Sequence, residues 1–164
     1  MLPDVLAANL RLVVCGTAAG SRSAQLNHYY AGDGNRFWSL LGKLGLTPRR
    51  LLPEEADLLL TFGIGLTDLV QGQSGADSEI DFSRTGAASL TWKVLALQPR
   101  VLCFNGKRAA QEYLQSKSVD YGLQPGRIGS TRLFVAPSTS TAANRSWDAA
   151  YWRELADLVA TPEP

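Results

Sequence analysis

The chain has 164 residues, of which 45% are hydrophobic and 19% charged, and its formal net charge is +1. This size and composition indicate one globular domain over residues 1–164 with a substantial core. No apolar run reaches the roughly 18 residues of a membrane span, so we expect a cytoplasmic protein that does not bind membranes. The near-zero net charge leaves a nucleic-acid partner open, because a local basic face is enough for binding.

The sequence argues against a metal centre. Its two cysteines, Cys15 and Cys103, both lie in apolar, strand-like runs. Two cysteines are too few for a four-thiolate iron–sulfur or zinc site, and one histidine, His28, cannot form a histidine-rich site. We therefore expect buried free thiols and no metal.

The first half of the chain alternates between apolar strands and helices. The predicted elements are a buried strand at 11–16, a helix at 35–46 with Asn35 as its N-cap, a helix at 53–62 and a strand at 63–70. Pro53 and the two acids after it are typical of a helix N-terminus. A long polar loop follows at 71–82.

The second half continues the alternation. The predicted elements are a helix at 83–100 stopped by Pro99, a strand at 100–106, a helix at 107–117, a turn, strand and Ser/Thr-rich loop within 126–147, and a helix at 146–160 capped by Ser146. Short buried strands between helices predict an α/β fold with a parallel sheet that helices cover on both faces.

Ligands of such sheets bind at the carboxyl ends of the strands. Four segments converge at that edge: 16–38, 66–72, 104–107 and 136–147. The glycine-rich turn in the first segment matches neither the P-loop nor the dinucleotide fingerprint, and in isolation it is a tight turn. Tyr29 and Tyr30, in the loop that follows, offer aromatic faces on which a flat ring such as a base can stack.

Two further segments suit anions. Asn105 and Lys107 mark a strand end and a helix start, where amides and the lysine charge attract phosphate, although a solvated helix start explains them equally well. The loop at 136–145 offers hydroxyls and amides for phosphate, or it only caps the last helix. A serine hydrolase is an alternative, in which Ser138 or Ser140 would need His28 as its base.

Asp68 is an unusual acid, because Leu66, Leu69 and Val70 around it are apolar. It is either a half-buried functional carboxylate or a turn residue that bonds its own backbone. The residues alone leave both interpretations open.

Taken together, four stretches resemble the uracil-DNA glycosylase superfamily, in particular its mismatch-specific uracil and thymine-DNA glycosylase branch. They are YYAGDGNRFW, GIGLTDLV, QPRVLCFNGK and APSTSTA, in the order of the family's motifs. The resemblance implies a three-layer fold with a central four-stranded parallel sheet between helices. It also implies a monomer, without metal or redox cofactor, that hydrolyses the N-glycosidic bond of a flipped-out base in double-stranded DNA. In a bacterium, such a protein would act at the nucleoid.

One motif departs from that branch. The branch has Gly-Ile-Asn-Pro-Gly, whose asparagine positions the attacking water, whereas this chain has GTAAG over residues 16–20 with Ala18 in that place. Either the protein is a catalytically silent damage-binding module, or another residue has taken over. A carboxylate near the sugar can stabilise the oxocarbenium-like cation and orient water. Asp68 aligns with a pocket-wall asparagine of the branch, so we predict Asp68 as the catalytic residue, with Asn35 as the second choice.

The resemblance assigns the remaining roles by position. Tyr30 would stack on the flipped base, while the amides of Ala18 and Ala19, together with Ser23, would contact its edge. The predicted phosphate contacts are Asn105, Lys107, Ser138 and Ser140. The predicted wedge that fills the gap in the duplex consists of Ala142, Ala143, Asn144 and Arg145, where the family often has a bulky apolar residue. The predicted function is that of a mismatch-specific uracil-DNA glycosylase of base excision repair.

Overall fold

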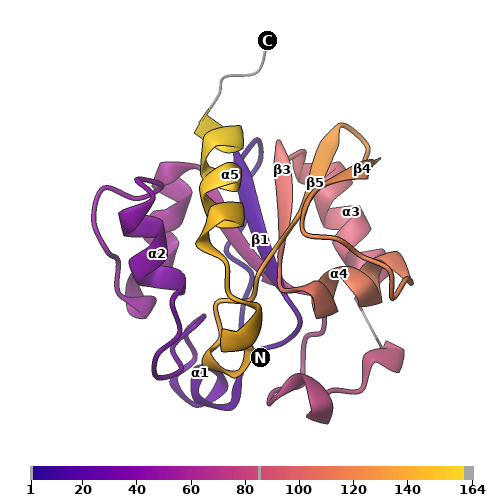
Figure 1. Ribbon diagram of the computed structural model, residues 1–164, viewed down its shortest axis with the longest axis horizontal. Helices are drawn as coiled ribbons and strands as arrows, with labels where there is room; N and C mark the ends of the chain where they lie inside the picture. The colour runs from indigo at the N-terminus through magenta and orange to yellow at the C-terminus, as the bar shows by residue number, and fades with distance from the viewer. Residues whose placement is uncertain (1, 85, 161–164) are drawn as a thin grey trace.

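A computed structural model describes residues 2–84 and 86–160, so the outermost residues of the predicted 1–164 domain and Thr85 of the predicted 83–100 helix lie outside the described residues. Five strands form one sheet in the order β2-β1-β3-β5-β4 (Figure 1). The strands are β1 (Leu12–Gly16), β2 (Ile64–Asp68), β3 (Val101–Asn105), β4 (Gly122–Ile128) and β5 (Thr131–Ala136).

The predicted α/β fold is confirmed, but its sheet is mostly rather than wholly parallel, and the strand count is corrected from four to five. β1 pairs in parallel with β2 and β3, and β3 pairs in parallel with β5. The additional strand, β4, pairs antiparallel with β5 at the edge, with a register irregularity between Leu123 and Arg127. Its sequence GLQPGRI contains Pro125, which strands tolerate only at edges or bulges, so the pattern does not resemble a buried strand.

Helices cover both faces of the sheet (Figure 1). Leu12 and Val14 of β1 face a core shared with two of these helices, whereas Val13 and Cys15 face a second core shared with the other two. The first pair is α2 (Phe37–Lys43) and α5 (Ala149–Ala160), and the second pair is α3 (Ala87–Leu97) and α4 (Lys107–Leu114). Cys15 and Cys103 are buried free thiols, as predicted.

Two helices start later than predicted, with different caps. α2 begins at Phe37, so its N-cap residue is Arg36 and not the predicted Asn35, although the Asn35 side chain still accepts a hydrogen bond from the Phe37 N–H at 3.0 Å. For α5, the side chain of Asp148 accepts a hydrogen bond from the Ala150 N–H at 2.9 Å. The predicted cap, Ser146, belongs instead to the preceding 3-10 segment.

The loops contain short helical segments that the sequence pattern does not predict. These are α1 (Ser21–Leu26), η2 (Asp77–Glu79), η3 (Phe82–Arg84) and η4 (Thr141–Ser146). α3 is shorter than its prediction, and Gln98 ends it in a left-handed conformation with φ of 52° just before Pro99. The residue before proline avoids the helical region, which explains this end.

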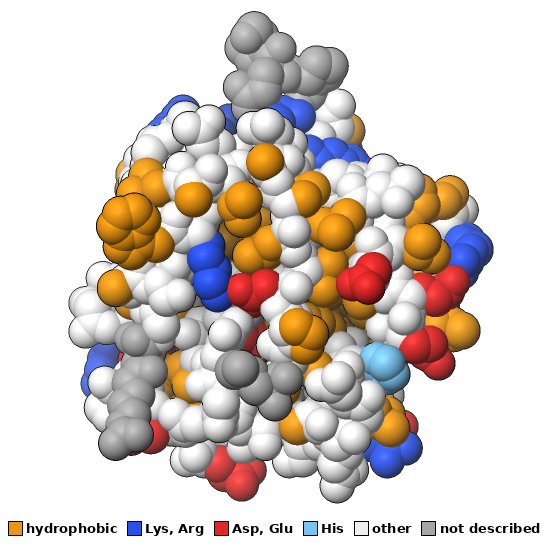
Figure 2. Space-filling model, turned by 180° about the vertical axis from the view of Figure 1, so that it is seen from behind, with side chains coloured by type: hydrophobic (Ala, Val, Ile, Leu, Met, Phe, Trp, Pro, Cys, Tyr) orange, Lys and Arg blue, Asp and Glu red, His pale blue; other side chains and the backbone are white. Residues whose placement is uncertain are grey.

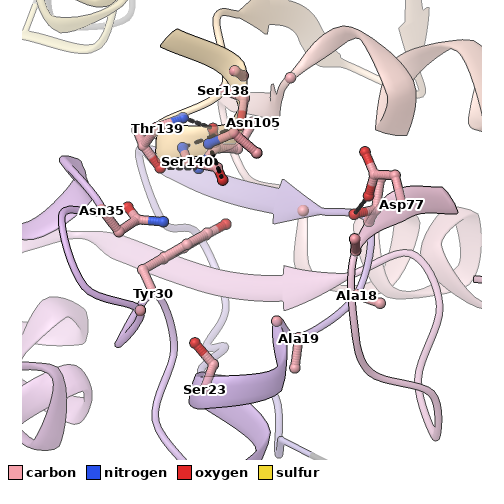
Figure 3. A pocket seen from close by; sticks show the side chains of 18 of the residues that line it. Ala18, Ala19, Ser23, Tyr30, Asn35, Asp77, Asn105, Ser138, Thr139 and Ser140 are labelled. Carbon is pink, nitrogen blue, oxygen red and sulfur yellow. Dashed lines mark hydrogen bonds between the residues drawn. The ribbon is translucent and has the colours of Figure 1, made fainter. Parts of the chain in front are cut away.

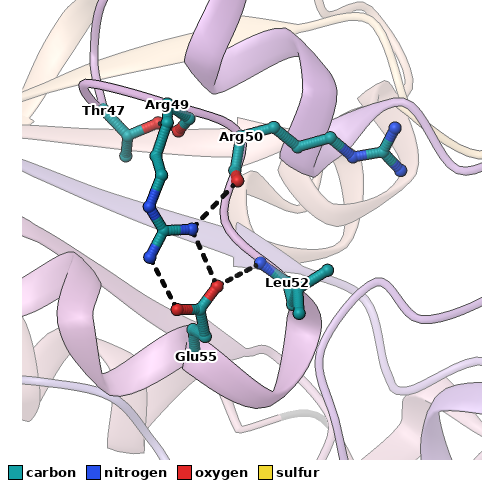
Figure 4. A network of polar contacts seen from close by, with 5 residues as sticks. All are labelled: Thr47, Arg49, Arg50, Leu52 and Glu55. Carbon is teal, nitrogen blue, oxygen red and sulfur yellow. Dashed lines mark hydrogen bonds and ion pairs between the residues drawn. The ribbon is translucent and has the colours of Figure 1, made fainter.

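The segment predicted as a helix at 53–62 is a 3-10 helix, η1 (Pro53–Phe62). The Glu55 carboxylate holds its start, accepting hydrogen bonds from the Leu52 N–H at 2.9 Å and from the Arg49 guanidinium at 2.7 and 3.0 Å (Figure 4). The hydrogen bond from Arg49 lowers the pKa of Glu55 to about 2. This network ties the connection after α2 to the start of η1.

Residues before β1 cover the outer edge of β2. Val5 exchanges two backbone hydrogen bonds with Leu66, at 2.9 and 2.8 Å. The neighbouring Asp4 accepts a hydrogen bond from the Thr67 hydroxyl at 2.6 Å and pairs with Lys93 of α3 at 2.6 Å. The N-terminal segment therefore ties β2 to α3.

The face shown in Figure 2 mixes basic, acidic and apolar side chains, without one continuous basic field. Among the described residues, no helix has the length and apolar character needed to cross a membrane.

Candidate active site

A cavity of about 690 Å³ opens at the carboxyl ends of β1, β2 and β3. Its walls are the turn after β1, the loop before α2, the end of β2, the junction of β3 with α4 and the loop after β5. These are the four segments predicted to converge, so that prediction is confirmed. The volume lies within the range of small-molecule sites in proteins.

A glycine makes room for two polar groups at the end of β1. Gly16 pairs in register with Asp68 of β2. A Cβ atom on Gly16 would lie 2.8 Å from Asp68 Oδ1 and 3.2 Å from the Tyr30 hydroxyl oxygen. The carboxyl and the hydroxyl therefore approach the same point, which a larger residue at position 16 would occupy.

The Asp68 carboxyl is buried without a hydrogen bond from any described residue. The residue is 8% exposed. Burial raises the pKa of its carboxyl to about 7, with Asp4 adding to the rise and the Lys93 charge opposing it. Asp68 is thus not a turn residue bonding its own backbone, and it changes between the acid and the carboxylate near neutral pH.

Tyr30 projects into the cavity between Ser23 and Asn35 (Figure 3). Its backbone has a positive φ of 51°, and its ring packs on Phe37 with centroids 4.3 Å apart. Its hydroxyl is buried with no hydrogen-bond partner among the described residues, and burial raises its pKa. The Asn105 side chain approaches the hydroxyl and opposes part of that rise, but the contact falls short of hydrogen-bond geometry.

Ala18 and Ala19 form a wall of small side chains (Figure 3). The polar loop after β2 supports this wall, because the Thr17 hydroxyl donates to Asp77 at 2.7 Å and the Gly75 N–H donates to the Ala19 carbonyl at 2.9 Å. The Ala18 N–H donates to no described residue. This wall offers a backbone donor and no side-chain acid or base.

Ser23 and Asn35 each accept one backbone hydrogen bond and keep a donor. The Ser23 hydroxyl oxygen accepts from the Ala31 N–H at 3.0 Å, and Asn35 Oδ1 accepts from the Phe37 N–H at 3.0 Å. The Ser23 hydroxyl and the Asn35 amide nitrogen remain as donors, and Figure 3 shows the nitrogen facing the cavity beside Tyr30.

The loop after β5 is held by Asn105. Its amide nitrogen donates to the Thr139 hydroxyl and its oxygen accepts from the Thr139 N–H, both at 3.0 Å (Figure 3). The hydroxyl oxygen of Ser138 accepts from the Ser140 N–H at 3.2 Å, and that of Ser140 accepts from the Ala142 N–H at 3.2 Å. Asn105 is thus engaged in holding the loop, while both serine hydroxyls retain a proton to donate.

Basic and aromatic residues form the rim near α4. Lys107 Nζ lies 4.4 Å from the centroid of the Tyr121 ring. Arg22, Arg108 and Tyr121 line the cavity too and are missing from the predicted set. The adjacent Lys-Arg pair in the sequence was a signal for Arg108. Tyr121 gave none, because its place depends on the unpredicted strand β4.

The predicted wedge residues Ala142 to Arg145 all lie in η4, and Asn144 and Arg145 are exposed. His28 does not line the cavity that contains Ser138 and Ser140. The structure therefore does not bring together the parts of a serine hydrolase. Within residues 2–84 and 86–160, no three His, Cys, Asp or Glu side chains are grouped to hold a metal ion.

Comparison with known proteins agrees with this architecture. A solution NMR structure from Methanosarcina acetivorans, of a protein described as a candidate uracil DNA glycosylase, is similar, with a TM-score of 0.61 and 26% sequence identity over 96% of this chain and 94% of that chain. The model of the uracil DNA glycosylase superfamily matches residues 3–156. Because this match covers nearly the whole chain, the protein belongs to the uracil DNA glycosylase superfamily.

Proposed function

We propose that the protein is a monofunctional DNA glycosylase that removes uracil, and other altered pyrimidines, from mismatched double-stranded DNA. The observation that carries this proposal is the presence, in one cavity, of the buried Asp68 carboxyl and the Tyr30 ring. A base must leave the duplex stack to reach such a cavity, where it can stack on an aromatic side chain. Membership of the superfamily supports the same reaction class.

Recognition of the base would use the donors on the cavity wall. The Ala18 N–H and the Ser23 hydroxyl would donate to carbonyl oxygens on the edge of the base. The methyl groups of Ala18 and Ala19 leave room for a substituent on the ring. Lys107, Ser138 and Ser140 would contact phosphates, and Asn105 would support them by holding the loop.

The reaction needs a group that accepts a proton. The C1′–N bond breaks and its electron pair leaves with the base, while a water oxygen bonds to C1′ and gives up a proton. An ionised Asp68 would accept that proton and stabilise the oxocarbenium-like sugar. Asn35 presents only an N–H donor to the cavity, because its oxygen accepts from Phe37. It would hold water or the base without taking the proton.

A single-turnover assay tests the proposal. The substrates are a duplex with one uracil opposite guanine, the same duplex with adenine opposite, and the single strand, with abasic product revealed by alkaline cleavage. We expect the fastest reaction from the mismatched duplex. Normal cleavage by Asp68→Asn, together with none by Asn35→Ala, would transfer the catalytic role to Asn35.

Ala18 favours a second candidate function, a damage-binding module without catalysis. The cavity wall formed by Ala18 and Ala19 carries no polar side chain at the position where the mismatch-specific branch has its asparagine. The same duplexes distinguish the two functions. Binding that depends on uracil, without abasic product at any pH or after long incubation, would establish the silent module.

A further inference from the structure

The segment Thr141–Ser146 carries the predicted wedge and is anchored at both ends by one residue. On one side, the Thr139 carbonyl accepts a hydrogen bond from the Arg36 backbone N–H at 3.0 Å. On the other side, the Arg36 guanidinium carbon lies 4.6 Å from the centroid of the Trp147 ring. Arg36 therefore contacts residues on both sides of this exposed segment, through its backbone at Thr139 and through its side chain at Trp147.

The loop that carries Arg36 also touches the segment directly. A Cβ atom on Gly34, whose φ is +75°, would lie 2.7 Å from Thr141 Cγ2. The two loops approach this closely only because residue 34 is glycine. The loop between α1 and α2 also carries Tyr30, so the stacking ring and the wedge lie on two loops that meet at Gly34 and Arg36.

The stability of the fold alone does not explain why residue 36 is an arginine. Its Nη1 is buried with no hydrogen-bond partner among the described residues, and a buried unpaired donor is destabilising. A shorter apolar side chain would avoid that cost. Unlike an apolar side chain, arginine can stack its planar cation on an aromatic face, and here this contact fixes the orientation of the Trp147 ring.

We propose that Arg36 is a positioning residue that fastens both ends of Thr141–Ser146 to the Tyr30 loop, so that the wedge is ordered before it fills the gap left by a flipped base. This inference rests on the proposed function. A segment that is already ordered loses less conformational entropy when DNA binds. We call the contacts of Arg36 with Thr139 and Trp147 the clamp. Single-stranded DNA has no gap to fill, so the clamp should affect duplex substrates and not single strands.

Hydrogen exchange in the free protein tests the clamp without any substrate. The reporters are the amides of Ala142, Ala143 and Trp147, which donate to the Ser140 hydroxyl oxygen, the Ser140 carbonyl and the Asn144 carbonyl at 3.2, 3.1 and 3.2 Å. Arg36→Leu should speed their exchange about three- to tenfold, the scale of one cation–π contact. Arg36→Lys should restore most of the protection. Arg153→Leu, at an exposed arginine of α5, is the matched control and should change nothing.

The second readout is the ratio of kcat/KM on the uracil-containing duplex to that on the single strand. Arg36→Leu should lower this ratio about three- to tenfold. If no substrate is cleaved, the proposed function fails. The ratio of affinities for a duplex and a single strand, each with a stable abasic-site analogue, then still tests the clamp.

Two outcomes would overturn the proposal. One is unchanged exchange in the segment together with an unchanged ratio. The other is faster exchange spread over the whole sheet, which would show that Arg36 only stabilises the fold. If Arg36→Leu does not fold, Trp147→Leu removes the same contact and should give the same local exchange and the same change in ratio.

Discussion

Gly16 and Asp68 stand opposite each other on neighbouring strands, and the absent side chain of one leaves room for the carboxyl of the other. Tyr30 brings its hydroxyl to the same point from a different loop. Burial at this point raises the pKa of the carboxyl to about 7. The charge of a single residue therefore changes in the pH range in which the protein would work.

The first prediction concerns the pH dependence of cleavage. If ionised Asp68 acts as the base, the single-turnover rate should rise about tenfold per pH unit below pH 7 and level off above it, since a higher pH favours the carboxylate. Asp68→Asn should lower the rate at least about a hundredfold and remove this dependence, with DNA binding largely kept. Asn35→Ala is the comparison, and it should retain the pH profile. A wild-type profile in Asp68→Asn would refute the assignment.

Two substitutions of Tyr30 distinguish a stacking role of its ring from a hydrogen-bonding role of its hydroxyl. Tyr30→Ala should lose about 1–3 kcal/mol of affinity for uracil-bearing DNA, the scale of one base–aromatic stack. Tyr30→Phe should bind normally and melt about 2–4 °C higher, because it removes a buried hydroxyl that has no partner. Affinity titration and calorimetry measure the two effects. Equal losses in both variants would mean that the hydroxyl itself reads the base.

Lys107 tests the phosphate contacts. Lys107→Ala should weaken binding to damaged and undamaged duplexes alike and flatten the slope of log affinity against log salt by about one. Lys117→Ala, at an exposed lysine that does not line the cavity, is the control for a general loss of charge. A loss of affinity confined to uracil-bearing DNA would show instead that Lys107 contacts the base.

At the scale of elements, the cavity depends on links between strand ends and loops. Asn105 at the end of β3 holds the loop after β5 through both of its hydrogen bonds to Thr139. Gly106, with φ of +108°, lets that loop approach, because a Cβ there would lie 3.2 Å from the Ser138 Cβ. The serine hydroxyls are therefore placed by a neighbouring strand as well as by their own.

Asn105→Ala should leave two buried polar groups of Thr139 without their partner. We expect a loss of about 2–4 kcal/mol in the free energy of unfolding, together with weaker DNA binding. Asn144→Ala, at an exposed asparagine, should leave the stability unchanged. Denaturant titration of the two variants measures the difference. Equal stabilities would show that Thr139 finds other partners.

The sequence predicted elements where burial gives a continuous signal. Four parallel strands were predicted because strands covered on both faces are apolar runs, and their topology brings the cavity segments together. β4 escaped prediction because Pro125 and polar residues interrupt its pattern. The link between Asn105 and Thr139 spans 34 residues, and no local pattern encodes such a contact. For the same reason the clamp between Arg36 and Trp147 emerges only from the folded chain.

At the scale of the whole molecule, the burial of Asp68 couples folding to pH. Its pKa is about 7 in the folded chain against an ordinary value of 3.8, so the folded chain keeps a proton that the unfolded chain loses above about pH 4. This contribution to stability is complete below about pH 4 and is lost as the pH rises through 7, at up to about 1.4 kcal/mol per pH unit.

Asp68→Asn should therefore gain stability relative to the natural chain as the pH rises from 5 to 8. Calorimetry gives the melting temperatures of Asp68→Asn and of the natural chain at pH 5 and at pH 8. The difference between the two proteins should be larger at pH 8. Asp33→Asn, at an exposed aspartate, is the control and should show no such change. A constant difference for Asp68→Asn would mean that its carboxyl is already ionised at pH 5.

The two backbone hydrogen bonds between Val5 and Leu66 also guard the molecule against self-association. β2 is the edge strand of the sheet, and all five of its residues are buried. A chain that lost the covering segment would present unpaired strand N–H and C=O groups at that edge, where a second molecule could add its own strand. The segment around Val5 should therefore reduce aggregation through this edge. A tag or fusion placed before it should leave Val5 able to form its two hydrogen bonds with Leu66.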